Sequence, residues 1–213
     1  MTYRGLMFDL DGTLLDTGEL IIKSFQHTMA VHHNRPADLA LIRAHFGKPL
    51  RSALAEMGPN VEEMAATYRE YNLAHHDELA GVFAGVVETV QELYNRGIRL
   101  AIVTSKTRKT AVRGLRLFDL DKYFPVVIGN EDCSRHKPDP EPVLLALAAL
   151  GLPAADCLMV GDSPHDLASA HAAGLKAAAV RWSEVPWDDV LAAKPDHIVE
   201  TMADLLALCP PAG

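Results

Sequence analysis

Two carboxylates stand two residues apart near the start of this 213-residue chain, at Asp9 and Asp11. At the end of a strand, such a pair can place one side chain at a reaction centre and the other beside it. The first carboxylate can then act as a nucleophile while the second transfers protons. A carboxylate is a weak nucleophile and a phosphate dianion repels it, so this chemistry needs positive charge close by. Alone, the pair is more simply explained as a turn or a helix cap.

Residues that could provide or hold positive charge follow later in the chain. Asp162 can help to bind Mg²⁺, a hard cation that prefers oxygen ligands and often bridges to a substrate phosphate. Lys137 would add a fixed charge that stabilises the equatorial oxygens of a transferring phosphoryl group. Thr104 and the backbone N–H groups at the start of the following helix could bind the same oxygens. Together these residue types predict a magnesium-dependent phosphohydrolase.

The predicted reaction has two steps. Asp9 attacks phosphorus to give an aspartyl-phosphate, while Asp11 donates a proton to the leaving oxygen. Asp11 then removes a proton from the water molecule that hydrolyses the intermediate. Each later motif also has a purely structural explanation, since prolines stop the loop around Lys137 and residues 161–164 resemble a capped turn before a helix. It is the occurrence of all the motifs in order, each at a strand end, that favours catalysis.

Short apolar runs alternate with helical patterns over most of the chain. This alternation predicts an α/β fold, with a Rossmann-like parallel sheet core and helices on both faces. The expected strands are residues 3–8, 100–103, 126–128, 157–160 and 177–180, and the expected helices are residues 86–96, 109–117, 141–150 and 165–173. In open parallel sheets ligands bind outside the carboxyl ends of the strands, where the polar residues above are expected.

One interval interrupts the alternation, because no good strand follows the first one for about sixty residues. We therefore expect a helical cap domain, residues 17–80, inserted into an α/β core formed by residues 1–16 and 81–213. Closure of the cap over the strand ends would exclude bulk water and bring Lys48 or Arg51 to the substrate.

Composition excludes several classes of protein. Acidic residues outnumber basic ones by 28 to 20, and this balance argues against a nucleic-acid partner. Three widely separated cysteines without a CxxC pair argue against a disulfide framework or a zinc site. The N-terminus lacks a signal-peptide pattern and no apolar run is long enough to span a bilayer, so we expect a cytoplasmic protein without a membrane partner. The oligomeric state stays open, a homodimer included.

The motifs DLDGT, TSK, HKPDP and GDSPHD, which begin at residues 9, 104, 136 and 161, together resemble the haloacid dehalogenase superfamily over the whole chain. The resemblance implies roles for six residues: Asp9 as nucleophile, Asp11 as acid and base, Thr104 as phosphate-binding hydroxyl, Lys137 as charge-neutralising group, Asp162 as metal ligand and Asp166 as its support. By the same resemblance Mg²⁺ would also contact Asp9 and the backbone carbonyl of Asp11. The second aspartate favours phosphate chemistry over dehalogenation.

Within the superfamily, the run Thr104-Ser105-Lys106-Thr107-Arg108 is similar to the second motif of the PpaX-type inorganic pyrophosphatases, which belong to the phosphoglycolate-phosphatase-like branch. The likeness extends to residues 19–25 and 68–72 in the expected cap. It implies hydrolysis of inorganic pyrophosphate, a small anionic substrate. The residues expected to bind this substrate are Thr13, Ser105, Lys106, Arg108, Lys48 and Arg51.

The residues alone leave other functions open. A compact polyanion needs several cations besides Mg²⁺, which this chain offers, and inorganic phosphate is a better leaving group than a sugar alkoxide. A phosphoglycolate or small sugar-phosphate phosphatase is the main alternative. A mutase is disfavoured by Gly161, where mutase relatives tend to carry an acidic residue. A phosphate-binding regulator is disfavoured as well, because it has no use for Asp11 or a cap.

Overall fold

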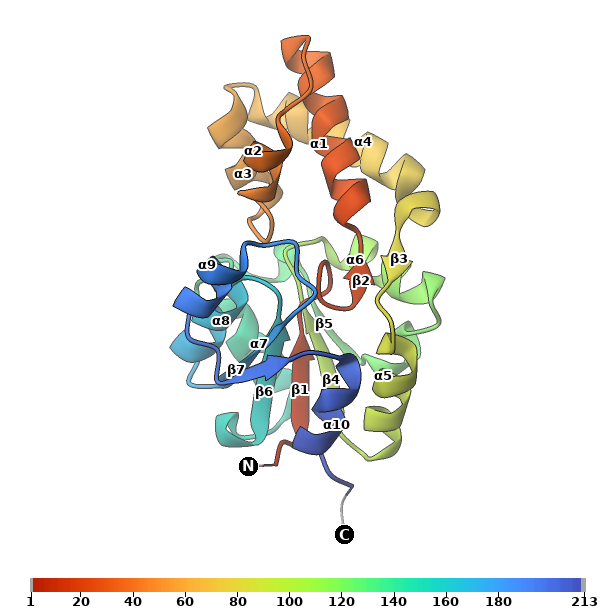
Figure 1. The fold of residues 1–213 in the computed structure, drawn as a ribbon, viewed down its shortest axis with the longest axis vertical. Coiled ribbons are helices and arrows are strands. Elements are labelled where there is room, and N and C mark those ends of the chain that lie inside the picture. Colours follow the sequence, from red (N-terminus) through yellow and green to blue (C-terminus); the bar gives the residue numbers. More distant parts are fainter. Residues whose placement is uncertain (1, 212–213) are drawn as a thin grey trace.

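The computed structural model describes residues 2–211, and within this range six parallel strands form one sheet (Figure 1). The strand order is β5-β4-β1-β6-β7-β8, so the first strand of the chain lies inside the sheet. The strands are β1 (Gly5–Phe8), β4 (Arg99–Val103), β5 (Val126–Ile128), β6 (Cys157–Gly161), β7 (Lys176–Val180) and β8 (His197–Val199). Because every neighbouring pair is parallel, all six carboxyl ends lie along one edge.

Helices cover both faces of the sheet, which explains why the strands are mostly apolar and buried after their first residue, the edge strands being partly exposed. Successive side chains of β1 enter different apolar clusters, Leu6 and Phe8 one of them and Met7 the other. The first cluster is covered by α5 (Val86–Asn95), α6 (Arg108–Leu117) and α10 (Leu205–Leu208), and the second by α7 (Glu141–Leu150), α8 (Pro164–Ala172) and α9 (Trp187–Ala192). The predicted fold class is thereby confirmed.

Local signals fix where the helices next to the sheet edge begin and end. α8 starts with a proline, and Asp166 Oδ2 accepts the Ser163 N–H at 3.1 Å, the side-chain half of a capping box. The same oxygen also accepts a hydrogen bond from Ser163 Oγ at 2.7 Å. α7 ends at Gly151, whose φ of 63° lies in the left-handed region that glycine adopts without strain. The cap on α8 holds the carboxylate of Asp166 in the first turn of the helix, at the edge of the sheet.

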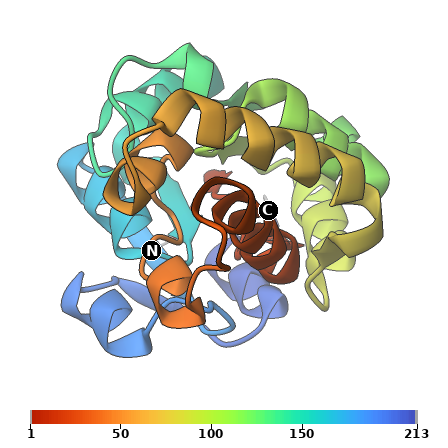
Figure 2. The same ribbon diagram turned by 90° about the horizontal axis from the view of Figure 1, so that it is seen from above.

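Four helices occupy the segment between β2 (Leu15–Asp16) and β3 (Gly81–Val82), and they lie beyond the carboxyl ends of the strands (Figures 1 and 2). They are α1 (Gly18–His33), α2 (Leu39–Arg43), α3 (Leu50–Met57) and α4 (Val61–Leu79), called the helical insertion below. They pack around an apolar cluster of their own, which includes Leu54 and Met64. β2 and β3 pair antiparallel, so the chain enters and leaves the insertion side by side. That residues 17–80 form a separate domain stays a prediction.

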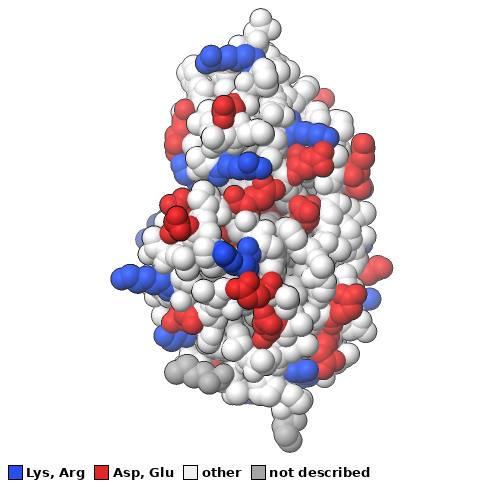
Figure 3. Space-filling view, in the orientation of Figure 1, with Lys and Arg blue, Asp and Glu red and all other residues white. Residues whose placement is uncertain are grey.

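The surface carries both charges. On the face drawn in Figure 3, basic side chains are interspersed with acidic ones and form no continuous basic area. None of the helices in residues 2–211 combines the length and the apolarity that a bilayer crossing requires.

Candidate active site

Asp9 lies directly after β1, at the carboxyl edge of the sheet, and is 6% exposed. Its backbone N–H donates to the Val160 carbonyl at 2.9 Å, which extends the pairing of β1 with β6 by one residue. Lys137 Nζ donates to Asp9 Oδ1 at 2.7 Å and to the Val103 carbonyl at 3.1 Å. Within residues 2–211 no protein donor bonds Asp9 Oδ2. One oxygen is therefore held by the lysine, while the other has no protein donor among the described residues.

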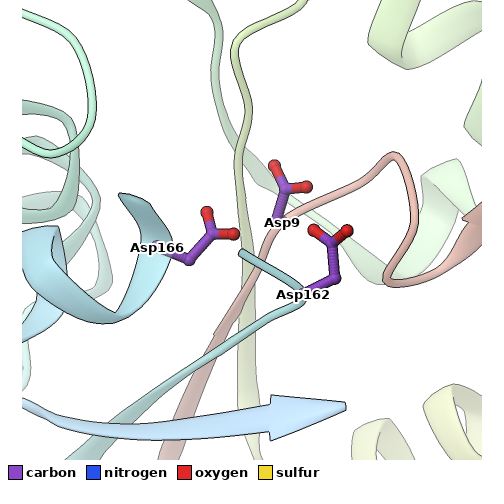
Figure 4. Close-up of side chains that lie close together, drawn as sticks. All are labelled: Asp9, Asp162 and Asp166. Carbon is purple, nitrogen blue, oxygen red and sulfur yellow. The ribbon is translucent and has the colours of Figure 1, made fainter. Parts of the chain in front are cut away.

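Two further carboxylates converge on Asp9 from neighbouring elements (Figure 4). Asp162 follows β6 and Asp166 lies in the first turn of α8, and one oxygen from each of the three aspartates lies within 4.8 Å of the others. Lys137 Nζ also donates to Asp166 Oδ1 at 2.5 Å, whereas Ser183 Oγ donates to Asp162 Oδ2 at 3.1 Å. Lys137 thus links two members of the cluster, and Asp162 is left without a basic partner among the described residues.

The charges in this cluster are not balanced. Burial raises the pKa of Asp162 well above its usual range, and the neighbouring Asp166 and Asp9 raise it further. Burial likewise raises the pKa of Asp9 to about 7, against the opposing effect of Lys137. For Lys137, burial alone would lower the pKa, but Asp166 and Asp9 outweigh it, so the ammonium stays charged. Three buried carboxylates facing one ammonium are a donor set that fits a hard divalent cation.

Asp11 is held by its own pair of donors, outside this cluster. Its Oδ1 accepts a hydrogen bond from Thr17 Oγ1 at 2.6 Å and lies 2.7 Å from Lys106 Nζ. Both contacts are made to one oxygen, and in the described part of the chain none is made to Oδ2. The free oxygen can therefore exchange a proton with a leaving group or a water molecule.

Of the three predicted hydroxyl residues, two lie at the site and one lies in the protein interior. Thr104 follows β4 and its Oγ1 accepts from the Lys106 N–H at 3.2 Å. Ser105 Oγ makes a long contact of 3.4 Å to the Gly47 carbonyl, which connects the sheet edge to the helical insertion. Thr13 is fully buried, and its Oγ1 has no partner among the described residues. Thr104 and Ser105 line the cavity described next, and Thr13 does not.

A cavity of about 680 Å³ separates the sheet edge from the helical insertion. At the sheet edge it is lined by Asp9, Asp11 and Asp162, and on the opposite side it is lined by residues of the insertion. The side chains of the insertion are in part apolar: Ile21, Phe25, Phe46, Leu50 and Tyr68. The cavity therefore joins a charged end, at the three carboxylates, to a less polar end between the helices.

Of the four predicted substrate-binding cations, three line this cavity. Lys48 Nζ is paired with Glu56 Oε1 at 2.9 Å, and Arg51 Nη2 with Glu62 Oε2 at 2.8 Å. Lys106 is the third, paired with Asp11 as described above. Each of these cations thus has a carboxylate partner within the protein.

The fourth, Arg108, is not brought to the cavity. Its guanidinium bonds both oxygens of Asp132, at 3.0 and 3.3 Å. Its backbone N–H donates to the Glu131 carboxylate at 3.0 Å. The first turn of α6, expected to present backbone N–H groups to a phosphate, is therefore capped by an acidic side chain of the protein at this position.

Three contacts at the site were missed from the sequence. Thr17 is the first residue of the predicted cap, six residues after Asp11, and a hydroxyl at that place was the available signal. Ser183 and Glu184 follow β7 in a loop without a recognisable motif, and only the folded chain brings them to the site. Ser183 contacts Asp162, and Glu184 lines the cavity while its Oε2 accepts from Arg43 Nε of the insertion at 3.3 Å.

Comparison with known proteins agrees with this geometry. Residues 6–180 match the family model described as haloacid dehalogenase-like hydrolase. The chain is 42% identical to the pyrophosphatase PpaX of Halalkalibacterium halodurans, over 97% of this chain and 96% of that protein. It is 41% identical to the pyrophosphatase PpaX of Anoxybacillus flavithermus, over 98% and 97%.

Solved structures show the same architecture. A crystal structure titled as a predicted phosphoglycolate phosphatase from Haemophilus somnus superposes with a TM-score of 0.84 at 25% identity, and the match covers 98% of each chain. This chain is thus similar to these relatives in sequence along nearly its full length, and similar to the solved structure in fold. The chain belongs to the haloacid dehalogenase-like hydrolases.

Proposed function

We propose that this protein is a magnesium-dependent hydrolase of inorganic pyrophosphate that works through an aspartyl-phosphate on Asp9. The observation that carries the mechanism is the state of the Asp9 carboxylate, with Lys137 on Oδ1, Oδ2 without a protein donor and Asp162 beside it. The choice of pyrophosphate rests on the names of the full-length relatives, at 41% and 42% identity.

In the first step Asp9 Oδ2 forms a bond to phosphorus, and the bond from phosphorus to the bridging oxygen breaks. Lys137 keeps the other oxygen in place and offsets the charge on the transferring group. Asp11 donates a proton from Oδ2 to the departing phosphate. In the second step Asp11 takes a proton from water, whose oxygen bonds to the same phosphorus while the bond from phosphorus to Asp9 Oδ2 breaks, so that phosphate is released and Asp9 is restored.

Mg²⁺ would be held by Asp9, Asp162 and the backbone carbonyl of Asp11. When bound, it supplies the positive charge that lets a carboxylate approach a phosphate dianion. Asp166 would position Lys137, because its Oδ1 accepts a hydrogen bond from the Lys137 ammonium. Asp166 is in turn held by Ser163 Oγ, which donates to its Oδ2.

On the substrate side, Thr104 and Ser105 would bind the phosphoryl group that is transferred, since both line the cavity next to Asp9. Lys48, Arg51 and Lys106 line the same cavity and would contribute to binding the anion. Arg108 is left out of this assignment, because Asp132 and Glu131 hold it elsewhere.

A phosphomonoesterase is the second candidate, favoured by one observation. The cavity falls in the range of about 300–1,000 Å³ that holds drug-sized ligands, and its upper end is partly apolar. Phosphoglycolate or a small sugar phosphate would occupy more of that space than pyrophosphate does.

The test compares phosphate release from pyrophosphate, phosphoglycolate and several sugar phosphates in the presence of Mg²⁺, with Asp9→Asn as the blank. The proposal expects pyrophosphate to be preferred by about a hundredfold or more in kcat/KM, equivalent to about 2.7 kcal/mol. A monoester that is preferred by a similar margin would replace pyrophosphate as the substrate and leave the Asp9 mechanism in place. Phosphate release by Asp9→Asn at the wild-type rate would contradict the mechanism itself.

A further inference from the structure

Two cations of the cavity are left unassigned by the mechanism above. The basic side chains that line the cavity are Lys48, Arg51, Arg69, Lys106 and Lys109. Lys48, Arg51 and Lys106 each have a carboxylate within 3 Å of the ammonium or guanidinium group. In the described chain, Arg69 and Lys109 are exposed, have no carboxylate within ion-pair distance and make no side-chain hydrogen bond, and Lys109 lies between this cavity and a neighbouring one. A cation paired with a carboxylate contributes little net potential to a cavity, whereas the charge of an unpaired one is offset by solvent and ions alone.

The two unpaired cations lie on elements that the structure fixes against each other. Arg69 belongs to α4 of the insertion, and Lys109 to the first turn of α6 beside the sheet edge. The helices are joined by Arg113, whose guanidinium forms two 3.0 Å bonds to Asp77 and a third to the Leu73 carbonyl. Leu73 is one turn after Arg69, and Arg113 is one turn after Lys109, so each cation lies one turn from the joined region on its own helix.

We propose that Arg69 and Lys109 form the subsite for the phosphate that leaves, and that they select pyrophosphate over phosphomonoesters. This inference rests on the proposed function. The transferred phosphoryl group is accounted for by Lys137, Thr104 and the metal ligands at the sheet edge. The second phosphate of pyrophosphate must lie farther toward the insertion, where a group with several negative charges needs cations that are not already neutralised. An ester leaving group has no such need.

The experiment uses the full chain with Arg69→Gln, Lys109→Gln and the double variant, assayed at fixed ionic strength with pyrophosphate and with p-nitrophenyl phosphate. The second substrate keeps the transferred phosphoryl group and lacks the second phosphate. We expect kcat/KM for pyrophosphate to fall by about 10–100-fold in the double variant, chiefly through KM, and kcat/KM for p-nitrophenyl phosphate to change by less than about twofold. Arg69→Lys, which keeps the charge, is expected to recover part of the loss.

Matched controls remove a positive charge elsewhere. Arg116→Gln removes an exposed cation from α6 that is paired with Asp121, and Lys23→Gln removes one from α1 that is paired with Glu19. Neither side chain lines the cavity. Both controls are expected to keep the wild-type ratio between the two substrates.

The possible outcomes separate this inference from the proposed function. If wild-type protein cleaves pyrophosphate and the double variant does so with the same KM, the subsite assignment is wrong while the function stands. An equal loss on both substrates would show a structural effect and would also overturn the assignment. If wild-type protein hydrolyses p-nitrophenyl phosphate but not pyrophosphate, both the function and the subsite are wrong.

Discussion

At the scale of single residues, the carboxylates of the site differ in the donors that hold them. Asp9 is held by a buried ammonium that also holds Asp166, whereas Asp11 is held by a hydroxyl and a less buried lysine. The two aspartates lie two residues apart in the chain and have different surroundings. In the proposed mechanism these different surroundings would let Asp9 act as nucleophile and Asp11 as proton donor.

The role of Asp11 gives a prediction about leaving groups. Asp11→Asn should keep the shape of the side chain but lose the proton, and kcat/KM, which reports the step in which the leaving group departs, should fall by about 10²–10⁴ for a phosphomonoester. For pyrophosphate the fall should be smaller, because phosphate needs less protonation as it departs. Steady-state kinetics with both substrates check this, and an equal fall in kcat/KM on both would contradict the role of Asp11 as general acid.

The excess negative charge at the three carboxylates predicts that Mg²⁺ stabilises the folded protein. A cation that binds only the folded state at about 100 times its Kd should add about 2.7 kcal/mol to the free energy of unfolding. Thermal unfolding with Mg²⁺ and with EDTA should therefore differ by several degrees. Asp162→Asn should lose most of this difference in melting temperature. Asp188→Asn, which changes an exposed residue of α9, should keep the difference. An undiminished shift in Asp162→Asn would place the cation elsewhere.

Asp196 predicts a pH dependence of stability that is unrelated to catalysis. Partial burial alone would raise the pKa of its carboxyl, but Lys176, the Ala177 N–H and His171 hold that pKa at about 2. A pKa lowered in the folded state stabilises the protein above the unfolded value near 3.8. That stabilisation is lost as the pH falls through about 2.

Asp196→Asn should therefore lower the free energy of unfolding by about 1–2 kcal/mol at pH 7. The difference from wild type should shrink as the pH falls from about 4 towards 2. Urea unfolding at several pH values checks this. A difference that stays constant down to pH 2 would mean that the charge of Asp196 is not its cause.

The sequence predicted those site residues that stand inside motifs at strand ends, because a parallel sheet brings such ends together whatever the loops do. Asp9, Asp162 and Asp166 converge for that reason. It could not predict contacts set by the course of a loop, such as Ser183 with Asp162. It also could not show that Arg108 is held by Asp132, since a basic residue next to a motif looks the same whether or not it is paired.

At the scale of elements, the turn from β6 into α8 depends on the missing side chain of Gly161. A Cβ at this position would lie 2.6 Å from Asp166 Cγ, closer than side chains approach in folded proteins. Gly161→Ala should therefore displace the first turn of α8 and destabilise the protein by about 1–3 kcal/mol. It should also lower kcat, because the displaced Asp166 holds Lys137.

Gly81→Ala is the matched control for that prediction. A Cβ at Gly81 would approach Asp16 Cβ to 3.4 Å, an ordinary van der Waals contact, and its backbone is not in the left-handed region. Chemical unfolding and steady-state kinetics should show a small effect for this control. A Gly161→Ala variant as stable and as active as Gly81→Ala would contradict the close packing of the turn.

Most elements were predictable because their apolar patterns are long enough. The runs at 100–103, 126–128, 157–160 and 177–180 became β4 to β7 with ends shifted by at most one residue. β8 was missed because it is a three-residue edge strand with Ile198 exposed, so burial imposes no pattern on it. β2 and β3 were missed because two residues are too few for any periodicity.

At the scale of the whole molecule, the helical insertion and the sheet each have an apolar cluster of their own. The cluster of the insertion is the smallest of the three, and the insertion meets the sheet part across the cavity. We therefore expect the insertion to open at a lower free energy than the sheet. Native-state hydrogen exchange should show faster exchange for the backbone amides of α1 to α4 than for β1, β4 and β6.

A matched substitution in each part would test this separation. Both side chains are fully buried, Leu54 in the cluster of the insertion and Leu158 in the sheet. Leu54→Ala should therefore raise the rate of amide hydrogen exchange mainly within the insertion, and Leu158→Ala should raise that rate throughout the chain. If Leu54→Ala accelerated exchange in β1 as much as in α4, the two parts would unfold together and the predicted boundary at residues 17–80 would be wrong.

The pairing of β2 with β3 has a consequence for how new enzymes could be assembled from related ones. Because the chain enters and leaves the insertion through two adjacent, hydrogen-bonded segments, a graft of the whole insertion from another member of the family needs only two junctions, at one place. The first junction lies beside Asp11, which accepts a hydrogen bond from Thr17 Oγ1, so a graft that begins after Thr17 leaves the aspartates and this partner unchanged. Such chimeras should inherit their chemistry from the recipient and their choice of leaving group, in large part, from the donor.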